Sequence, residues 1–442
     1  MLPQTVRVGV TGLARAGKTA FLTSVAANLL AFGAGRPVLP ALTRRLDGRA
    51  MRVAIAPAGA EEVPRFDYGR HLAALATDPP HWPARTDAAS LLALDLSVEQ
   101  SAFGLPLPDR RIRLELLDYP GEWLLDLPLL GLDYAAWSAQ ALRRLQAPEV
   151  APFAREFLSF AAALPARASR DESLAETGHT LYRAALERLR DDAGLSLLQP
   201  GRFLMPPPGE EPPWMLFFPA RGEGGLIELM AERYARYVDA VRDDLVSPLF
   251  GNLDRIVVLA DLLTALAHGP VAFADARDAL AAAAGALRWR RSWAEIVLAL
   301  SRLRLPPAAV ERVAYVATKA DHVAAGQRAN LAELTRALTV GEGDGDVVAT
   351  RLTAASVRCT QEATWLLDGR AVSAVEGRMP GKGRVRSYPG EVPPGPPDPG
   401  FWEHPFFELP EFEPPRLPEG GRAGVPHLNL DVLVAFLLDD LL

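Results

Sequence analysis

The sequence predicts an α/β fold built around a mainly parallel β-sheet with one antiparallel edge strand, interrupted by a helical domain. Three observations predict it. Short apolar runs alternate with helical patterns, a glycine-rich loop joins the first run to the first helix, and residues 128–246 carry mostly helical patterns. The 442 residues suffice for two or three domains. We therefore expect residues 1–127 and 247–442 to form the α/β domain with a proline-rich C-terminal extension, and residues 128–246 to form a helical insertion domain.

The first half of the chain contains the predicted antiparallel strand pair. Residues 6–10 form a short apolar strand pattern, and residues 19–32 continue as a helix. Residues 33–86 are rich in proline and glycine, and we expect them to be irregular. Residues 91–97 and 110–118 alternate apolar and polar side chains with period two. This alternation, with a short link between the runs, predicts an antiparallel pair.

The second half supplies the remaining parallel strands. Apolar runs at residues 253–263 and 312–321 are typical of buried parallel strands, and residues 346–356 form a fifth candidate. Residues 276–305 have a helical pattern. The tail from 388 to 422 is rich in proline and ends in an amphipathic helix at 430–442. We expect the tail to wrap the surface through four aromatic side chains, Phe401, Trp402, Phe406 and Phe407.

Composition excludes several classes of protein. The net charge of −7 argues against a nucleic-acid partner, although residues 381–387 form a local basic patch. The single cysteine, Cys359, excludes an internal disulfide and fits a reducing compartment; we expect it to be a small buried side chain. The N-terminus lacks a signal-peptide pattern, and no apolar run reaches the roughly 20 residues of a transmembrane segment. We expect a cytoplasmic location.

The loop between the first strand and the first helix, GLARAGKT at 12–19, matches the phosphate-loop pattern without a mismatch. Its glycines let backbone N–H groups turn toward a phosphate, and the following helix adds the positive end of its dipole. Lys18 is expected to reach the β- and γ-phosphates, and the Thr19 hydroxyl to bind Mg²⁺. The alternative is a glycine-rich turn with a solvated lysine. The expected nucleotide contacts are Gly12, Ala14, Arg15, Ala16, Gly17, Lys18, Thr19 and Ala20.

A D-x-x-G pattern follows the strand at 110–118. Asp118 ends that strand and is expected to hold the magnesium ion through water, while Gly121 offers its N–H to a γ-phosphate. Thr86, which precedes the strand at 91–97, is chosen as the threonine that covers the γ-phosphate and the metal ion. Thr77 and Thr43 are weaker candidates. The alternatives are an ordinary turn at the D-x-x-G pattern and a loop cap at Thr86.

The sequence TKAD at 318–321 follows another buried strand. Asp321 is expected to accept from the two N–H donors of guanine, an edge that adenine does not offer, while Thr318 and Lys319 complete the loop and the Lys319 stem lies on the base. Ala355 and Ser356, after the next strand, are candidates for a backbone contact with the guanine carbonyl. The alternative is a polar strand end that caps a helix.

The order of these motifs is that of a Ras-like P-loop GTPase, and the antiparallel pair favours this class over a RecA-like ATPase. We expect a GTP-binding switch with Mg²⁺ as cofactor that hydrolyses GTP slowly. Glu122 and Arg15 are the catalytic candidates, Glu122 as a base and Arg15 as an arginine finger within the chain. The alternatives are a glutamate with no part in the chemistry and a solvated loop arginine. Two alternatives stay open: an ATPase in which TKAD is accidental, and a non-catalytic module that binds a partner in a nucleotide-dependent way.

The stretches at 8–24, 118–130, 318–322, 355–362 and 405–417 also resemble the YcjX family of bacterial stress-associated P-loop proteins. The resemblance covers most of the chain and includes linkers as well as nucleotide motifs. It implies a GTP-binding protein with a helical insertion and a link to a stress response. The helical insertion begins just after Asp118 and Gly121, so a protein effector is expected to bind there.

Overall fold

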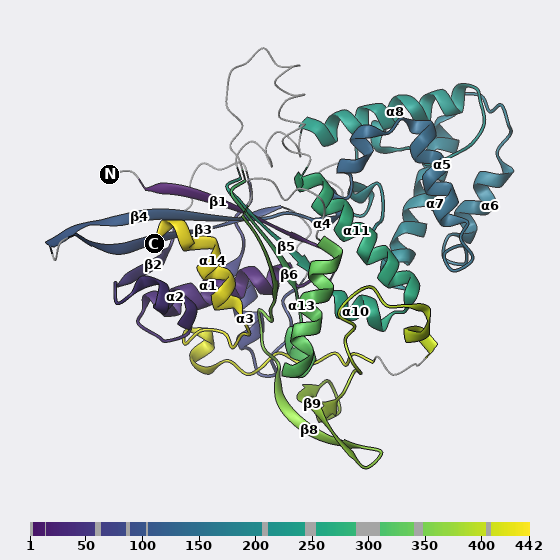
Figure 1. Ribbon diagram of the computed structural model, residues 1–442. Helices are drawn as coiled ribbons and strands as arrows, with labels where there is room; N and C mark the ends of the chain where they lie inside the picture. The colour runs from purple at the N-terminus through teal and green to yellow at the C-terminus, as the bar shows by residue number, and fades with distance from the viewer. Residues whose placement is uncertain are drawn as a thin grey trace. The chain divides into compact units, whose positions relative to one another are not determined.

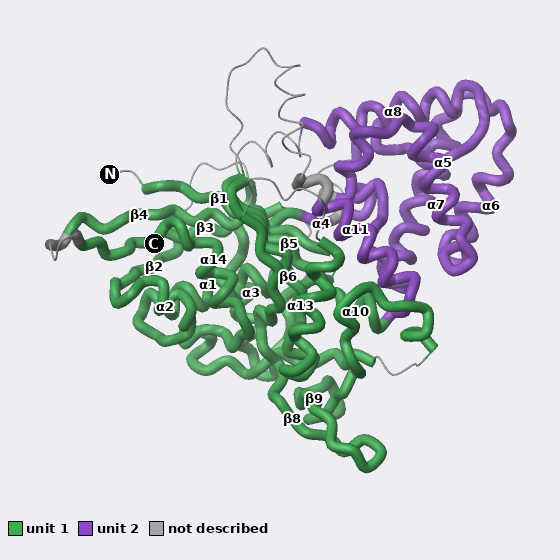
Figure 2. Tube along the Cα trace, in the orientation of Figure 1, with its two compact units in different colours: residues 1–119, 253–267, 309–442 green, residues 120–252, 268–308 purple. Residues whose placement is uncertain are grey.

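The computed structural model describes residues 3–13, 15–57, 63–84, 89–102, 105–205, 211–243, 253–288, 310–339, 348–403 and 408–442. The chain divides into two compact units (Figure 2). Unit 1 comprises residues 1–119, 253–267 and 309–442, and unit 2 comprises residues 120–252 and 268–308. Unit 2 is thus wider than the expected 128–246. Residues 268–308 belong to unit 2 because Asp275 forms an ion pair with Arg144. Asp275 also accepts the backbone N–H of Leu197 at 2.9 Å.

Unit 1 is built on a seven-stranded sheet in the order β2-β3-β4-β1-β5-β6-β7 (Figure 1). Strands β4, β1, β5, β6 and β7 are parallel, while β3 is antiparallel to both of its neighbours. The expected P-loop NTPase fold is confirmed, with short β2 added outside the antiparallel strand. The strands are β1 Gln4–Gly12, β2 Met51–Ile55, β3 Ser90–Ala102, β4 Leu105–Asp118, β5 Arg255–Ala260, β6 Arg312–Ala317 and β7 Val348–Thr353.

The burial of the strands follows their side-chain patterns. Every residue of β5 is buried, as the continuous apolar run predicts for a strand covered on both faces. In β4 the alternating side chains of Ile112, Leu114 and Leu116 are at most 3% exposed. Glu115 is a buried exception on the other face of the strand, and its carboxylate lies 2.8 Å from Nε of Arg7. The alternation therefore identifies the core face correctly.

Residues 33–86 are not irregular throughout, contrary to the expectation from their proline and glycine content. They contain α2 Pro40–Leu46, β2 and α3 Tyr68–Ala76. Pro40 occupies the first turn of α2, where proline is tolerated because that N–H needs no helical partner. The other helices of unit 1 are α1 Lys18–Gly33, α10 Leu262–Ala267, α13 Ala325–Thr339 and α14 Leu430–Leu438.

A second, three-stranded antiparallel sheet follows β7 and was not expected from the sequence. It contains β8 Thr360–Leu367, β9 Arg370–Met379 and β10 Gly383–Ser387. The proline-rich tail is anchored against it by Phe412, because a Cβ atom on Gly377 would lie 2.5 Å from the Phe412 ring. Of the four aromatic residues expected to anchor the tail, Phe401 and Trp402 pack on each other, with ring centroids 4.9 Å apart. Phe406 and Phe407 lie outside the described residues.

Unit 2 is helical in its described part. Its helices are α4 Gly121–Leu124, α5 Tyr134–Leu145, α6 Arg155–Ala163, α7 Glu172–Asp191, α8 Gly225–Val241 and α11 Pro270–Arg288. Asp133 and Asp171 cap α5 and α7 by accepting backbone N–H bonds. Trp137 fills the core and stacks on Tyr234, with ring centroids 5.1 Å apart. The part of the helix pattern at 276–305 beyond residue 288 lies outside the described residues.

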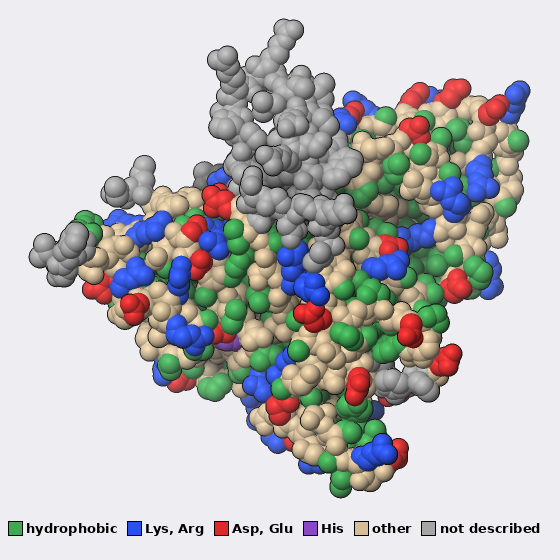
Figure 3. Space-filling view, viewed as in Figure 1, with side chains coloured by type: hydrophobic (Ala, Val, Ile, Leu, Met, Phe, Trp, Pro, Cys, Tyr) green, Lys and Arg blue, Asp and Glu red, His purple; other side chains and the backbone are tan. Residues whose placement is uncertain are grey.

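The surface shows both signs of charge. In the view of Figure 3, the Lys and Arg side chains are interspersed with Asp and Glu side chains. Within the ranges given above, no helix combines the length and the apolar character that crossing a bilayer requires.

Candidate functional site

The phosphate loop leaves β1 at Gly12 and enters α1 at Lys18. A Cβ atom on Gly12 would lie 2.4 Å from the backbone oxygen of Leu259, so only glycine fits beside β5 there. Gly17 has φ +81°, a left-handed conformation that favours glycine. The two glycines of the motif are therefore required for two different reasons. Ala14 lies outside the described residues.

The first turn of α1 is suited to an anion. Its N-cap residue, Gly17, makes no side-chain cap, and the first turn carries no acidic residue. By contrast, an aspartate caps each of the described helices α3, α5, α7 and α10. Uncapped N–H groups at the positive end of a 16-residue helix favour a bound phosphate. Nζ of Lys18 lies 3.3 Å from the Gly12 oxygen, so the lysine is folded back over the loop.

Asp118 lies beside the end of β1. It is the last residue of β4, is 3% exposed, and is in register with Val10 of β1 and Ser90 of β3. The N–H of Tyr119 continues the ladder by donating to the Val10 oxygen at 2.9 Å. This register brings Asp118 to the strand end from which the phosphate loop departs.

The remaining residues expected around the γ-phosphate have separate outcomes. Gly121 opens α4 in unit 2, whereas Asp118 belongs to unit 1. Thr86 and the side chain of Glu122 lie outside the described residues. The two weaker threonine candidates bond helix carbonyls: Thr77 donates to Ala74 at 2.8 Å and Thr43 to Leu39 at 3.2 Å. The contacts of Gly121, Glu122 and Thr86 with a nucleotide stay predictions.

The TKAD segment begins where β6 ends. The N–H of Thr318 donates to the Ala260 oxygen of β5 at 2.9 Å, and Lys319 has φ +57°. Nζ of Lys319 lies 2.5 Å from Oδ2 of Asp261 and 3.1 Å from Oγ1 of Thr264. Sequence reasoning missed Asp261. The signal was present, because Asp261 directly follows a buried strand, and Asp118 was chosen for its place at the end of such a strand.

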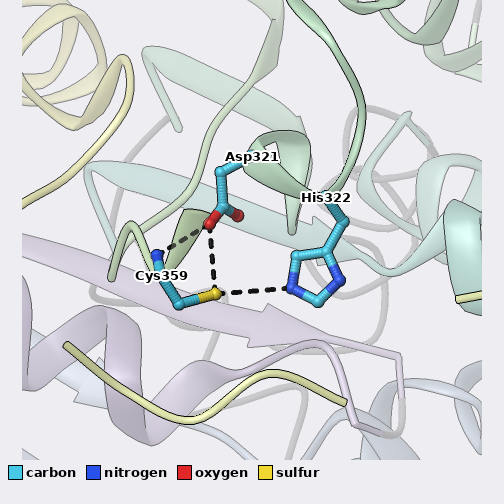
Figure 4. A group of neighbouring side chains, drawn as sticks. All are labelled: Asp321, His322 and Cys359. Atoms are coloured by element: carbon cyan, nitrogen blue, oxygen red, sulfur yellow. Dashed lines mark hydrogen bonds between the residues drawn. The ribbon is translucent and has the colours of Figure 1, made fainter. Parts of the chain in front are cut away.

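The carboxylate of Asp321 is held by the chain that follows β7 (Figure 4). Asp321 is 1% exposed and lies in a 3-10 turn, Ala320–His322. Its Oδ2 accepts the backbone N–H of Cys359 at 2.8 Å and the thiol at 3.2 Å. Burial and the neighbouring carboxylate raise the pKa of Cys359 far above its usual range, so the thiol stays protonated and donates. Cys359 was expected to be a small buried side chain. It also donates a hydrogen bond to Asp321, which the sequence did not predict.

The loop after β7 lies beside the TKAD segment. Ala354 donates to the Ala317 oxygen at 2.9 Å, which keeps the loop beside TKAD. The N–H of Ala355 donates to the Leu428 oxygen at 3.0 Å, because the C-terminal segment pairs with the loop, and its expected contact with the guanine carbonyl stays a prediction. Ser356 is the second candidate for that contact. Its backbone oxygen accepts a hydrogen bond from Oγ of Ser24 in α1.

One strand brings the two principal motifs together. Leu13 of the phosphate loop donates to the Leu259 oxygen at 3.0 Å, and Thr318 donates to the next oxygen of β5, that of Ala260, at 2.9 Å. Both motifs therefore start at adjacent positions on the same sheet edge, where the carboxyl ends of parallel strands meet. Such an edge is where open α/β sheets bind ligands.

The chain matches the model of the YcjX-like family, DUF463, over residues 6–442. Ras-like GTPase YcjX of Escherichia coli (strain K12) is 32% identical over 455 aligned positions, which cover 98% of this chain and 95% of the relative. Ras-like GTPase YcjX of Shewanella oneidensis (strain MR-1) is 30% identical over 464 positions, which cover 98% and 94%. Together with the P-loop fold, these matches show that the chain belongs to the YcjX-like family.

Proposed function

We propose that this protein binds GTP and GDP with Mg²⁺ at the carboxyl edge of its parallel sheet, and that it hydrolyses GTP slowly. The observation that carries the proposal is the attachment of Leu13 and Thr318 to consecutive oxygens of β5. The phosphate loop and the TKAD segment thus start on the two sides of β5, an arrangement that supports the binding of one nucleotide by both. The names of the two relatives support the same activity.

The phosphate end of the nucleotide is assigned to α1 and β4. Lys18 swings from the Gly12 oxygen to the β- and γ-phosphates, and the first-turn N–H groups of α1 bind phosphate oxygens. The Thr19 hydroxyl and the Asp118 carboxylate offer the oxygen ligands that Mg²⁺ prefers. The ion neutralises charge on the β- and γ-phosphates during transfer to water.

The base end is assigned to the loops after β6 and β7. Asp321 accepts from the two N–H donors of guanine, and the bonds from Cys359 fix the plane of its carboxylate. Asp261 holds the ammonium group of Lys319, so the lysine stem is positioned to lie along the base. Adenine has no matching pair of donors, so the arrangement selects guanine.

Chain connectivity suggests how the nucleotide state reaches a partner. Pro120, the first residue of unit 2, comes two positions after Asp118, and Gly121 opens α4. Loss of the γ-phosphate releases the segment at Gly121 and with it the start of the helical unit. We assign the effector surface to unit 2. The cytoplasmic location and the role in a stress response stay predictions.

The test is a titration of the full chain with fluorescent GDP and Mg²⁺, followed by competition with GTP and with ATP. We expect GTP to displace the probe and ATP to leave it bound. Lys18→Ala should weaken both nucleotides, and Asp321→Ala should remove the preference for guanine. Lys382→Ala is the matched control, since Lys382 lies in the turn between β9 and β10. Equal competition by ATP, with no effect of Asp321→Ala, would replace the GTPase proposal with an ATPase.

A further inference from the structure

Three side chains of different chemistry converge at the end of the TKAD segment (Figure 4). They are Asp321, His322 and Cys359, and one ligand atom from each lies within 4.8 Å of the others. Sγ of Cys359 is 3.2 Å from Oδ2 of Asp321 and 3.7 Å from Nε2 of His322. A thiol, an imidazole and a carboxylate are the three side-chain ligands of zinc sites.

Two of the three distances between these atoms are close to those around a tetrahedral ion. Zinc binds sulfur at about 2.3 Å, and nitrogen and oxygen at about 2.0–2.2 Å, which sets neighbouring ligand atoms about 3.2–3.6 Å apart. The Sγ–Oδ2 distance lies within this interval and the Sγ–Nε2 distance next to it, while the carboxylate and imidazole atoms lie within 4.8 Å of each other. An ion enters when the carboxylate and the imidazole adjust around it, and three protein ligands leave a fourth position open.

The surroundings hold Asp321 and His322 in place. Oγ1 of Thr360 donates to the backbone oxygen of Asp321, and the N–H of His322 donates to Lys319 at 2.8 Å. The His322 ring packs edge-on against Phe412, with ring centroids 5.1 Å apart. His322 is 7% exposed. Fixed ligands lower the ordering cost that a flexible site would bear on binding.

We propose that Asp321, His322 and Cys359 form a binding site for a zinc-type divalent ion, and that this ion and a guanine base exclude each other. The exclusion rests on the proposed function, because it assigns Asp321 to the base. The positive charge of an ion bound to the Asp321 carboxylate repels the N–H donors of guanine and draws electron density from the oxygens that would accept them. The ion would thus act as an inhibitor of nucleotide binding.

The proton balance of the binding step is simple. The thiol of Cys359 loses its proton to solvent, and the sulfur forms a bond to the ion while Oδ2 of Asp321 exchanges the S–H donor for the metal. The oxidation states of sulfur and metal do not change. Mg²⁺ does not compete effectively, because it prefers octahedral oxygen ligands to sulfur and nitrogen.

The coupling must be reciprocal. If the ion weakens GDP binding by some factor, GDP weakens binding of the ion by the same factor. We expect at least about tenfold in both directions, which corresponds to about 1.4 kcal/mol. Measuring both directions separates true competition from general damage to the protein by metal.

The first experiment uses Co²⁺ as a spectroscopic probe, added to the full, tag-free, nucleotide-free chain. A thiolate bound to Co²⁺ gives a near-ultraviolet charge-transfer band, and the chain has one cysteine, so such a band must report Cys359. We expect the band in the wild type, its removal by Zn²⁺, and its absence in Cys359→Ser. If saturating Co²⁺ gives no band in the wild type, the site does not exist.

His322→Gln tests the second ligand, and His71→Gln is its matched control. His71 is likewise buried and packs on a phenylalanine, Phe66, with ring centroids 4.8 Å apart. We expect His322→Gln to weaken Co²⁺ binding at least tenfold and His71→Gln to leave it unchanged. Equal loss in both variants, or none in His322→Gln, would overturn the assignment of His322.

The second experiment adds GDP to the Co²⁺-loaded chain and, in reverse, Zn²⁺ to the GDP-bound chain. Loss of the band on adding GDP, with weaker GDP binding in Zn²⁺, supports mutual exclusion. A band that persists while GDP binds would overturn it. Failure of the proposed function looks different: the metal-free chain then binds no GDP, and the band still forms. In that case the metal site stands and the inhibitory role falls.

Discussion

Nζ of Lys319 lies 2.5 Å from Oδ2 of Asp261, and the two residues follow neighbouring parallel strands. The side chain of Asp261 is 4% exposed and that of Lys319 is 34% exposed. The other oxygen of Asp261 accepts the N–H of Thr264 at 3.0 Å and caps α10. One buried carboxylate therefore orients the lysine of the TKAD segment and begins a helix.

Asp261→Asn separates these two roles. Asparagine keeps an oxygen for the cap, so α10 should persist, but the charge that holds Lys319 is lost. We expect GDP affinity to fall about fivefold to thirtyfold, corresponding to about 1–2 kcal/mol, in a fluorescent GDP titration. The control is Asp254→Asn at the opposite end of β5, where Asp254 accepts the N–H of Arg7 at 2.8 Å. Unchanged affinity in Asp261→Asn would show that the ion pair does not position the lysine for the base.

The two glycines of the phosphate loop should respond differently to alanine. In Gly12→Ala the new methyl group meets the Leu259 backbone oxygen at 2.4 Å, so we expect a loss of about 3 kcal/mol in unfolding free energy. In Gly17→Ala nothing lies within 4 Å, and only the positive φ is unfavourable, at about 1 kcal/mol. Urea unfolding of the nucleotide-free chain measures both.

Gly69→Ala is the control for that series. Gly69 lies in α3, and its Cβ atom would lie 3.9 Å from Oδ1 of Asp67, which is an ordinary contact. The higher helix propensity of alanine should therefore raise the free energy of unfolding by about 0.5–1 kcal/mol. If Gly12→Ala were no more destabilising than Gly17→Ala, the inference that Gly12 lies too close to β5 for a side chain would be wrong.

Short sequence patterns predict the elements of this fold whose structure depends on residues close together in the chain. The sequence predicts four such elements because their apolar runs and turn residues occur within a few positions of one another: the phosphate loop, β1, β5 and β6. The second sheet is not visible in this way. Most of β8 is exposed on both faces, so its sequence lacks the half-buried alternation that identifies a strand.

In the candidate site, too, the sequence did not predict contacts between residues that lie far apart in the chain. Cys359 reaches Asp321 across 38 positions, and the C-terminal segment at Leu428 binds the Ala355 N–H expected at the base. These pairs are set by tertiary packing, and no short motif encodes them. Sequence reasoning therefore proposed the phosphate-binding residues and the TKAD segment, but missed Asp261 and Cys359, which orient the segment.

Asp126 gives unit 2 a specific dependence of stability on pH. Its carboxylate is fully buried and accepts the N–H of Gly201 at 2.7 Å and the hydroxyl of Tyr237. Burial raises the pKa of Asp126 from 3.8 to about 6. The folded chain then binds the proton more tightly than the unfolded chain, so this contribution to stability is present at low pH and is lost as pH rises toward 6. Between about pH 4 and pH 7 the loss amounts to about 2 kcal/mol.

Asp126→Asn tests this sign because asparagine does not titrate. We expect the stability gap between wild type and Asp126→Asn to narrow by about 2 kcal/mol as pH rises from about 4 to 7, in urea unfolding followed by tryptophan fluorescence. Asp133→Asn changes an exposed cap of α5 and should keep the pH dependence of the wild type. A gap that widens with pH would contradict the raised pKa.

Arg15 and Glu122 are the candidates for the hydrolytic step and should be separable from binding. Arg15 lies exposed in the phosphate loop with φ +61°, where its guanidinium can stabilise charge on the transferring phosphoryl group. We expect Arg15→Ala to slow single-turnover GTP hydrolysis at least about 100-fold, Glu122→Ala to slow it less, and both to keep GDP affinity within about threefold. Arg370→Ala, at the exposed start of β9, is the matched control. A variant with unchanged turnover removes its residue from the chemistry, and a variant that loses GDP binding assigns that residue to positioning the nucleotide.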